Sequence, residues 1–177
     1  LRVITGLTAG VPIVLDTDSD VVRPGGDMFG WVGLDIGWMV FATGFGASWN
    51  AINLNALEGG DEFGRSPLAR LYISPEIRFQ VPVAKAVLPY LSGAFDANWF
   101  RYRATDLACE FWYCFGRSRF SFTPGFTAKI GMGIRVAERI FVDVGTKLSM
   151  SGAGDFFDST QWWVTPYVGV IYRGTAD

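Results

Sequence analysis

The residue types that most often carry acid–base chemistry are poorly supplied in this chain, whose 177 residues include no histidine. Histidine is the commonest general base and the commonest metal ligand. Carboxylates could still act in pairs, but the candidates alternate along the sequence with basic residues. The six charged positions concerned are Glu76, Arg78, Asp96, Lys129, Asp143 and Lys147. Because a carboxylate already paired with a cation makes a poor general acid, we predict no enzymatic activity.

One acidic segment has part of the spacing of a calcium loop. Asp16, Asp18 and Asp20 occupy its first, third and fifth positions, and Asp27 occupies the twelfth. The sixth position, where an EF-hand needs glycine for its turn, is Val21, so that motif fails. A surface calcium site and a solvated acidic loop remain as alternatives. We predict no metal site and no cofactor.

Two cysteines, Cys109 and Cys114, lie at the two ends of a six-residue segment that is rich in aromatic residues. An even count at short spacing predicts a disulfide in an oxidising compartment, and two free thiols are the alternative. The aromatic residues in and beside this six-residue segment are Phe111, Trp112, Tyr113 and Phe115. Exposed aromatic patches are typical of contact sites, so we predict a partner-contact loop. The alternative is a loop that folds down over the mouth of the fold.

Four arginines lie on either side of the same segment: Arg101, Arg103, Arg117 and Arg119. Guanidinium groups bind phosphate in a bidentate manner, and a hairpin would bring these four together. They are therefore candidates for binding the phosphorylated sugars of lipopolysaccharide. Ordinary surface solvation, with pairing to Asp106 and Glu110, is the alternative.

The overall composition excludes several classes of protein. Half of the residues are hydrophobic, 18% are charged and 16% are aromatic, which excludes disorder, and a net charge of −2 indicates no nucleic-acid partner. The uncharged run 36–57 is long enough for a spanning helix, but its glycines and asparagines disfavour one. Since no charged and then apolar segment follows Leu1, we expect any targeting peptide to be absent or already removed.

Strict alternation of apolar and polar residues is the strongest pattern in the sequence. Every second residue from Phe120 to Val136 is apolar, and the intervening residues are small, hydroxyl-bearing or charged. Such a strand is longer than the usual globular strand of about 5–6 residues. The same reading predicts eight strands, at residues 2–15, 27–38, 42–54, 71–81, 87–99, 120–136, 140–150 and 162–172.

The connections between these strands alternate strictly in length. Short links fall at 39–41, 83–86 and 137–139, and long ones fall at 16–26, 55–69, 104–118 and 152–161. This is typical of an all-β fold, an eight-stranded antiparallel up-and-down transmembrane β-barrel, which we predict as a single domain over residues 1–177. The bulky apolar face would then meet lipid, and the small and charged face would fill a narrow lumen.

Two further sets of residues bear on the predicted barrel. Aromatic residues at strand ends are expected to form an interfacial girdle; these are Trp99, Tyr102, Phe120, Trp162 and Trp163. Prolines within strands each remove a donor from the hydrogen-bond ladder, so we expect bulges or locally open pairing at Pro75, Pro89, Pro124 and Pro166.

Two motifs resemble the Pro-Tyr-x-Gly strand openings of small outer-membrane β-barrels of the OmpA and OmpX type. They are Leu88-Pro89-Tyr90-Leu91-Ser92-Gly93 and Thr165-Pro166-Tyr167-Val168-Gly169-Val170, and residues 168–173 are similar to the final strand of those barrels. Such barrels usually end on an aromatic residue, whereas this chain continues to Asp177. The resemblance implies the outer membrane of a Gram-negative bacterium, with the long loops extracellular and both termini periplasmic. It identifies an architecture and no activity.

These patterns together predict a non-enzymatic barrel with a structural or surface-contact role. We expect Glu76, Asp96 and Asp143 to pair in the lumen with Arg78, Lys129 and Lys147. The expected partners are outer-membrane lipid and lipopolysaccharide, with another surface or envelope protein as a further candidate. The alternative function is a small pore or a carrier for small solutes or hydrophobic ligands.

Overall fold

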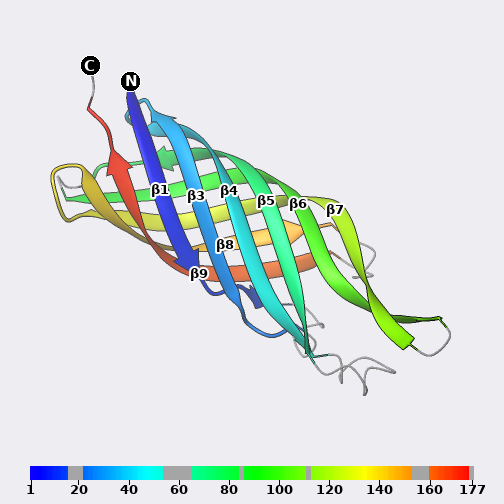
Figure 1. Ribbon diagram of the computed structural model, residues 1–177. Coiled ribbons are helices and arrows are strands. Elements are labelled where there is room, and N and C mark those ends of the chain that lie inside the picture. The colour runs from blue at the N-terminus through cyan, green and yellow to red at the C-terminus, as the bar shows by residue number, and fades with distance from the viewer. Residues whose placement is uncertain (16–21, 54–64, 84–85, 111–112, 153–159, 176–177) are drawn as a thin grey trace.

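The computed structural model describes residues 1–15, 22–53, 65–83, 86–110, 113–152 and 160–175, without the side chains of residues 52–53, 65–67 and 102–119. Long antiparallel strands wrap into a barrel in which the N- and C-termini lie at one end (Figure 1). The strands are β1 (Arg2–Gly10), β2 (Ile13–Val14), β3 (Gly26–Asp35), β4 (Met39–Asn53), β5 (Arg65–Gln80), β6 (Val87–Glu110), β7 (Tyr113–Arg135), β8 (Ile140–Ser151) and β9 (Gln161–Arg173). Within these ranges the chain forms no helix long and apolar enough to cross a membrane.

The barrel is closed by pairing between the first and last strands. β1 pairs with both β3 and β9, β2 pairs with β9, and each strand from β3 to β8 pairs with the next strand along the chain. β1 and β2 are interrupted only by Val11 and Pro12, and both keep one register against β9, from Gly10↔Tyr167 to Ile13↔Val164. They are therefore one strand, and the predicted closed barrel of eight antiparallel strands is confirmed.

Alternation places the two kinds of side chain on opposite faces of the wall. Along β7, Phe122, Phe126 and Ile130 are exposed on the outer surface, while Thr127 and Lys129 are buried inside. The predicted outward set of the N-terminal strands, which includes Val32 and Leu34, is exposed in the same way. Trp163 is different: it is 2% exposed and lies inside the barrel, since its neighbour Trp162 takes the outward position. Its assignment to the interfacial girdle was wrong.

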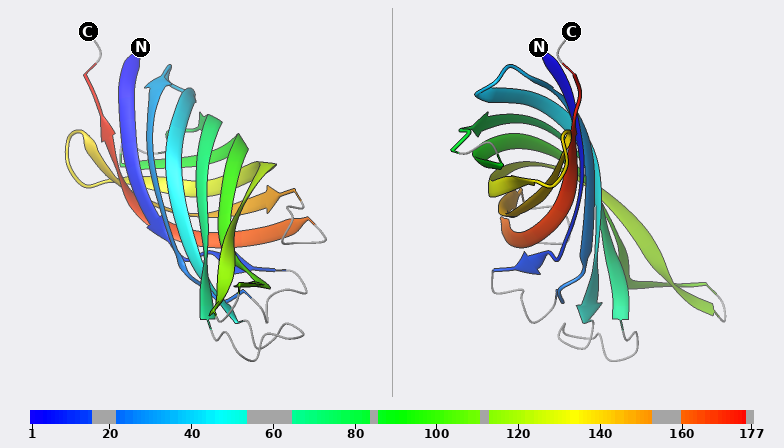
Figure 2. Two further views of the ribbon diagram at one scale, coloured as in Figure 1. Left: turned by 45° about the vertical axis from the view of Figure 1, so that its right-hand side comes forward. Right: turned by 90° about the vertical axis from the view of Figure 1, so that its left-hand side faces the viewer.

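Three predicted connections differ in the structure. The long link predicted at 55–69 overlaps β5, which begins at Arg65. The turn between β3 and β4 is formed by residues 36–38 and not by 39–41, and Gly37 adopts a φ of 102° there, which a side chain would disfavour. The long loop predicted at 104–118 is mostly strand. β6 and β7 continue as a paired ribbon to Glu110↔Tyr113, with a register shift between Arg103 and Leu107. This extension leaves the wall of the barrel and projects beyond the other strands (Figure 2).

The prolines within strands do not produce bulges. At most of them, the side of the residue that lacks an N–H donor faces the neighbouring chain at or beyond the end of the paired ladder. The carbonyl groups of Pro89, Pro124 and Pro166 accept hydrogen bonds from Val81, Gly152 and Val11, which lie at or just outside strand ends. Pro75 is the exception. The β5–β6 ladder keeps its register but lacks the pairs of residues 74 and 75, so the predicted local opening occurs at this one proline.

Candidate functional site

Aromatic side chains fill much of the lumen, and four of them each lie against a glycine on the neighbouring strand. The register pairs are Gly6↔Trp31, Gly46↔Tyr72, Tyr90↔Gly131 and Gly145↔Tyr167. A Cβ atom added at Gly131 would lie 2.6 Å from the Tyr90 ring, so no larger residue fits beneath it. Small wall residues thus provide the volume into which the rings pack.

A charged cluster occupies the middle of the lumen and centres on Glu76. Its carboxylate pairs with Lys129, and its Oε1 atom lies 3.2 Å from Arg78 Nε. The Arg78 guanidinium is also held between two rings, 4.5 Å from the Trp31 centroid and 4.0 Å from that of Tyr90. Glu76 therefore balances two cations that are both buried.

The tyrosines of the two Pro-Tyr-x-Gly motifs meet inside this cluster. The Tyr90 hydroxyl donates to Asp143 Oδ1 at 2.7 Å and is hydrogen-bonded to the Tyr167 hydroxyl. Because the Tyr90 proton is directed to Asp143, Tyr167 is the donor of that second bond. The motifs therefore join β6 to β9 across the lumen.

A second charged cluster lies on the loop side of the first. Lys147 Nζ lies 2.6 Å from Asp27 Oδ2 and 2.8 Å from the Tyr72 hydroxyl, which itself donates to Asp27 Oδ1 at 3.0 Å. The Tyr72 ring stacks on Phe29, with centroids 5.6 Å apart. Every polar atom of this triad thus has a partner from a different strand.

Arg70 and Asp96 continue this cluster. Arg70 donates to Asn98 Oδ1 at 2.7 Å and lies 3.4 Å from Asp96 Oδ2. Asp96, which is fully buried, also accepts hydrogen bonds from the hydroxyl groups of Ser74 and Thr127.

The end of the barrel that carries the termini is held by Asp35. Its carboxylate lies 2.6 Å from Arg173 Nε and accepts hydrogen bonds from Gln80 at 3.1 Å and from the Gly37 backbone at 2.8 Å. One acidic side chain therefore joins β3, β5 and β9 at this mouth.

The described lumen is balanced in charge and densely filled. Its buried and half-buried ionic groups are five carboxylates, Asp27, Asp35, Glu76, Asp96 and Asp143, and five cations, Arg70, Arg78, Lys129, Lys147 and Arg173. A cavity of about 10 Å³ lies among Arg78, Lys129, Asp143 and Lys147, which is room for about one water molecule. The described residues contain no group of side chains suited to hold a metal ion.

All six charged positions predicted for the lumen lie there, but three of the pairings differ. Asp96 pairs with Arg70 on the adjacent strand β5, Lys147 pairs with Asp27 across the lumen, and Asp143 accepts a hydrogen bond from Tyr90. In the sequence, Asp27 occupies the twelfth position of a failed calcium motif, whose residues 16–20 lie outside the described ranges. Alternation could have found both missed partners, since Met28 and Leu71 are outward and place Asp27 and Arg70 inward.

The predicted lipopolysaccharide-binding arginines lie at the base of the projecting β6–β7 ribbon. Arg101 is exposed, and its guanidinium lies 5.6 Å from the ring of its register partner Phe120. Arg103 pairs with Ser118, and Arg119 pairs with Tyr102. Arg119 therefore lies one register position away from the pair that Arg101 forms with Phe120. The side chains of Arg103, Arg117 and Arg119 lie outside the description, as do those of the predicted partner-contact residues Phe111, Trp112, Tyr113 and Phe115.

Cys109 and Cys114 are register partners in the same ribbon, and their side chains are also outside the description. Directly opposed residues of an antiparallel pair have Cα atoms about 4.5–5.5 Å apart, within the range of about 4.4–6.8 Å that a disulfide spans. We expect labelling of the unreduced, denatured protein to find no free thiol, and Cys109→Ser to lower stability by about 2 kcal/mol. Two labelled thiols would contradict the bond.

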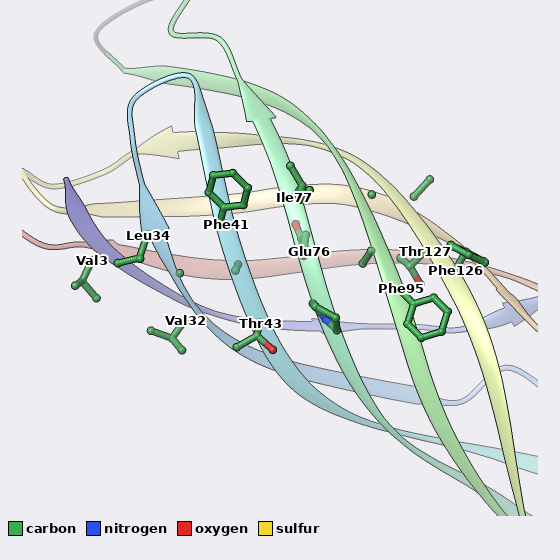
Figure 3. Close-up of a pocket in the computed structure, with 16 residues that line it drawn as sticks. Val3, Val32, Leu34, Phe41, Thr43, Glu76, Ile77, Phe95, Phe126 and Thr127 are labelled. Atoms are coloured by element: carbon green, nitrogen blue, oxygen red, sulfur yellow. The ribbon is translucent and has the colours of Figure 1, made fainter.

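The outer wall carries an apolar depression of about 940 Å³ over β1 and β3–β7 (Figure 3). Small outward residues, Thr43, Gly93 and Ala128, form its floor between the larger side chains of Phe41 and Phe95. It opens toward the surroundings of the barrel and away from the charged lumen, so it belongs to the apolar belt.

Comparison with solved structures shows the same fold. Neisserial surface protein A is 14% identical over 96% of each chain, with a TM-score of 0.71. Ail of Yersinia pestis, in complex with the heparin analogue sucrose octasulfate, is 9% identical over 97% of this chain and 96% of its own, with a TM-score of 0.54. The outer membrane protein OprG of Pseudomonas aeruginosa is 12% identical over 99% and 96%, with a TM-score of 0.51.

No protein-family model matches the sequence, and no curated protein matches it. The comparison with known proteins therefore rests on the solved structures. At these identities they show that the chain has the fold of the small eight-stranded outer-membrane barrels, as the sequence motifs predicted.

Proposed function

We propose that this chain is a non-enzymatic outer-membrane anchor that presents its β6–β7 ribbon at the cell surface. In this arrangement the loop end is extracellular and both termini are periplasmic. The observation that carries the proposal is the filled lumen, whose ten ionic groups compensate one another. A closed barrel leaves the projecting ribbon as the part that is free to act.

The lumen supports an anchor over a pore for an energetic reason. Removing one member of a buried ion pair leaves the other uncompensated, and such a change costs about 3–5 kcal/mol. A passage along the axis would require breaking the Glu76 cluster and the Asp27–Lys147 pair together. The packed rings between them, Phe29 and Tyr72, would also have to move.

The ribbon supports a surface role because its two strands pair with each other, and this pairing does not depend on the wall of the barrel. Its strands bond to each other as far as Glu110↔Tyr113, beyond the register shift that follows Arg103. A paired ribbon holds its tip at a fixed distance from the membrane. The predicted contact residues 111–115 lie at that tip in the sequence.

Phosphorylated lipopolysaccharide is the partner that we propose for the base of the ribbon. Arg101 is exposed on the outer face at a strand position flanked by the aromatic rings of Trp99 and Phe120, and this combination is typical of the membrane interface. Guanidinium groups at that height would meet headgroup phosphates. A barrel of the same fold, Ail, binds a polysulfated sugar, which is a related class of anion.

Single-channel recording in planar bilayers tests the anchor function. We expect the purified protein to add no ohmic conductance comparable to that of a porin, because the described lumen is filled. A porin-like conductance would overturn the proposal and favour the alternative function, a small pore or carrier. A porin inserted under the same conditions is the positive control.

Replacing all four ribbon arginines by Gln should weaken co-purification with lipopolysaccharide. Each lost phosphate contact is worth about 1–3 kcal/mol, and the lumen is untouched, so folding in detergent should not change. Thermal stability should fall only in membranes that contain lipopolysaccharide. Arg23→Gln, which removes an exposed arginine outside the ribbon, is the control. Equal retention of lipopolysaccharide by the quadruple variant and the parent would make the cluster ordinary surface charge.

A further inference from the structure

The end of the barrel that carries the termini contains a basic pocket that the proposed function does not use. The pocket has a volume of about 420 Å³ and is lined by polar and apolar groups from several strands. Its charged lining residues are Arg2, Arg135, Glu138, Arg139 and Arg173. The turn between β7 and β8 and the two chain ends meet at this mouth (Figure 1).

Compensating charge is scarce among the described residues of this pocket. Arg173 is neutralised by Asp35, with 2.5 Å between Nη2 and Oδ2. The remaining guanidinium groups, those of Arg2, Arg135 and Arg139, share one lining carboxylate, that of Glu138. The described lumen below is neutral, so the described residues of this mouth carry an excess of positive charge.

Two of these arginines are held in place by bonds that leave part of each fork available. Arg135 Nη2 donates to the Glu138 carbonyl at 3.0 Å, and its Nε donates to the Ala137 carbonyl at 3.3 Å. Arg139 is hydrogen-bonded to the Tyr172 hydroxyl, which raises the pKa of its guanidinium and keeps it charged. Each guanidinium has five N–H donors, so donors remain for a ligand.

The walls of the pocket strengthen these charges. Leu88 and Phe141 form an apolar floor, and Phe141 is 6% exposed. The Arg173 guanidinium lies 5.9 Å from the Phe141 ring centroid, so the ion pair with Asp35 covers the same floor. Interaction between an ion and a fixed charge is stronger beside low-dielectric walls than in open water.

We propose that this pocket binds an anion of the phosphate class, carried by a soluble molecule or by a lipid headgroup. Convergent guanidinium groups recognise the tetrahedral oxygens of phosphate through charge-assisted, paired hydrogen bonds. A volume of 420 Å³ exceeds that of one phosphate, so the pocket has room for a second group beside it. The arginines come from β1, β7, β9 and one turn, and a bound anion would therefore tie the barrel closure to its neighbours.

Calorimetric titration with inorganic pyrophosphate, in zwitterionic detergent at constant ionic strength, tests this site. Parent protein should bind in a saturable manner, and Arg2→Gln/Arg139→Gln should weaken binding by about tenfold for each guanidinium removed. Glu138→Gln should tighten binding, because the lining carboxylate repels the anion. Arg23→Gln, which removes one exposed arginine on the loop side of the barrel, should have no effect.

A second measurement distinguishes a lipid headgroup from a soluble molecule as the source of the anion. The melting temperature is compared in nanodiscs of phosphatidylglycerol and of phosphatidylcholine, with and without pyrophosphate. A stabilisation by phosphatidylglycerol that Arg2→Gln/Arg139→Gln removes assigns a lipid headgroup. Stabilisation by pyrophosphate that is independent of the lipid assigns a soluble ligand. If neither probe distinguishes that variant from the parent, or if Glu138→Gln weakens pyrophosphate binding, the proposal is wrong.

Discussion

Replacing Glu76 by Gln should destabilise the folded barrel by about 3–5 kcal/mol, because Lys129 and Arg78 would stay buried without their shared counter-charge. Glu76 and both cations are almost fully excluded from solvent, so water cannot take over its role. The free energy of unfolding is measured in detergent by urea titration, followed by the electrophoretic mobility of the unheated protein. The midpoint should fall well below that of the parent.

Two further variants separate charge from packing. Glu138→Gln removes the same charge from an exposed turn and should leave stability within about 0.5 kcal/mol of the parent. Adding Lys129→Met to Glu76→Gln removes one of the two stranded cations and should recover part of the loss. If Glu76→Gln is as stable as Glu138→Gln, the cluster does not contribute to stability as the geometry implies.

Replacing Ile130 by Arg should cost about 2–4 kcal/mol in a lipid bilayer. Ile130 points outward within the apolar run 120–136 of β7, is 67% exposed and therefore loses little packing when it is changed. The cost arises from placing a charge in hydrocarbon. On a soluble barrel the same exposed position would accept arginine without penalty, so this variant tests whether the apolar belt faces lipid.

Val136→Arg is the matched control, since Val136 is outward at 61% exposure but lies just past the end of β7. The penalty for arginine falls to about 0–1 kcal/mol near the membrane interface. Both variants are refolded into vesicles and unfolded with guanidinium chloride. If the two variants are equally stable, the outward face of β7 does not lie in the hydrocarbon of a membrane.

Much of the fold could be predicted from period-two alternation, because a strand buried on one face and exposed to lipid on the other must alternate. The clean run from Phe120 to Val136 gave the correct faces along β7, and the eight strands and their order follow from the same pattern. Strand ends were predicted less well. The turn at Gly37 is hard to recognise because Ile36 and Trp38, on either side of it, continue the apolar alternation of the strand.

The extension of β6 and β7 could not be predicted, since the register shift after Arg103 breaks the alternation there. Ion-pair partners were also beyond the reach of sequence spacing. Asp27 and Lys147 are 120 residues apart, and the tilt of the strands and the closure of the barrel decide that they meet. Alternation predicts which residues face the lumen, but it contains no information on the height or the angle at which they do so.

The contact between lumen rings and wall glycines has a consequence for how this protein can change. Tyr90 lies over Gly131, and Tyr167 lies over Gly145, so the two members of each pair share one fixed volume. A larger residue at either glycine is tolerated only if the ring opposite becomes smaller in the same lineage. The two positions of each pair should therefore covary among related proteins, and a change at one position without a change at the other should be selected against.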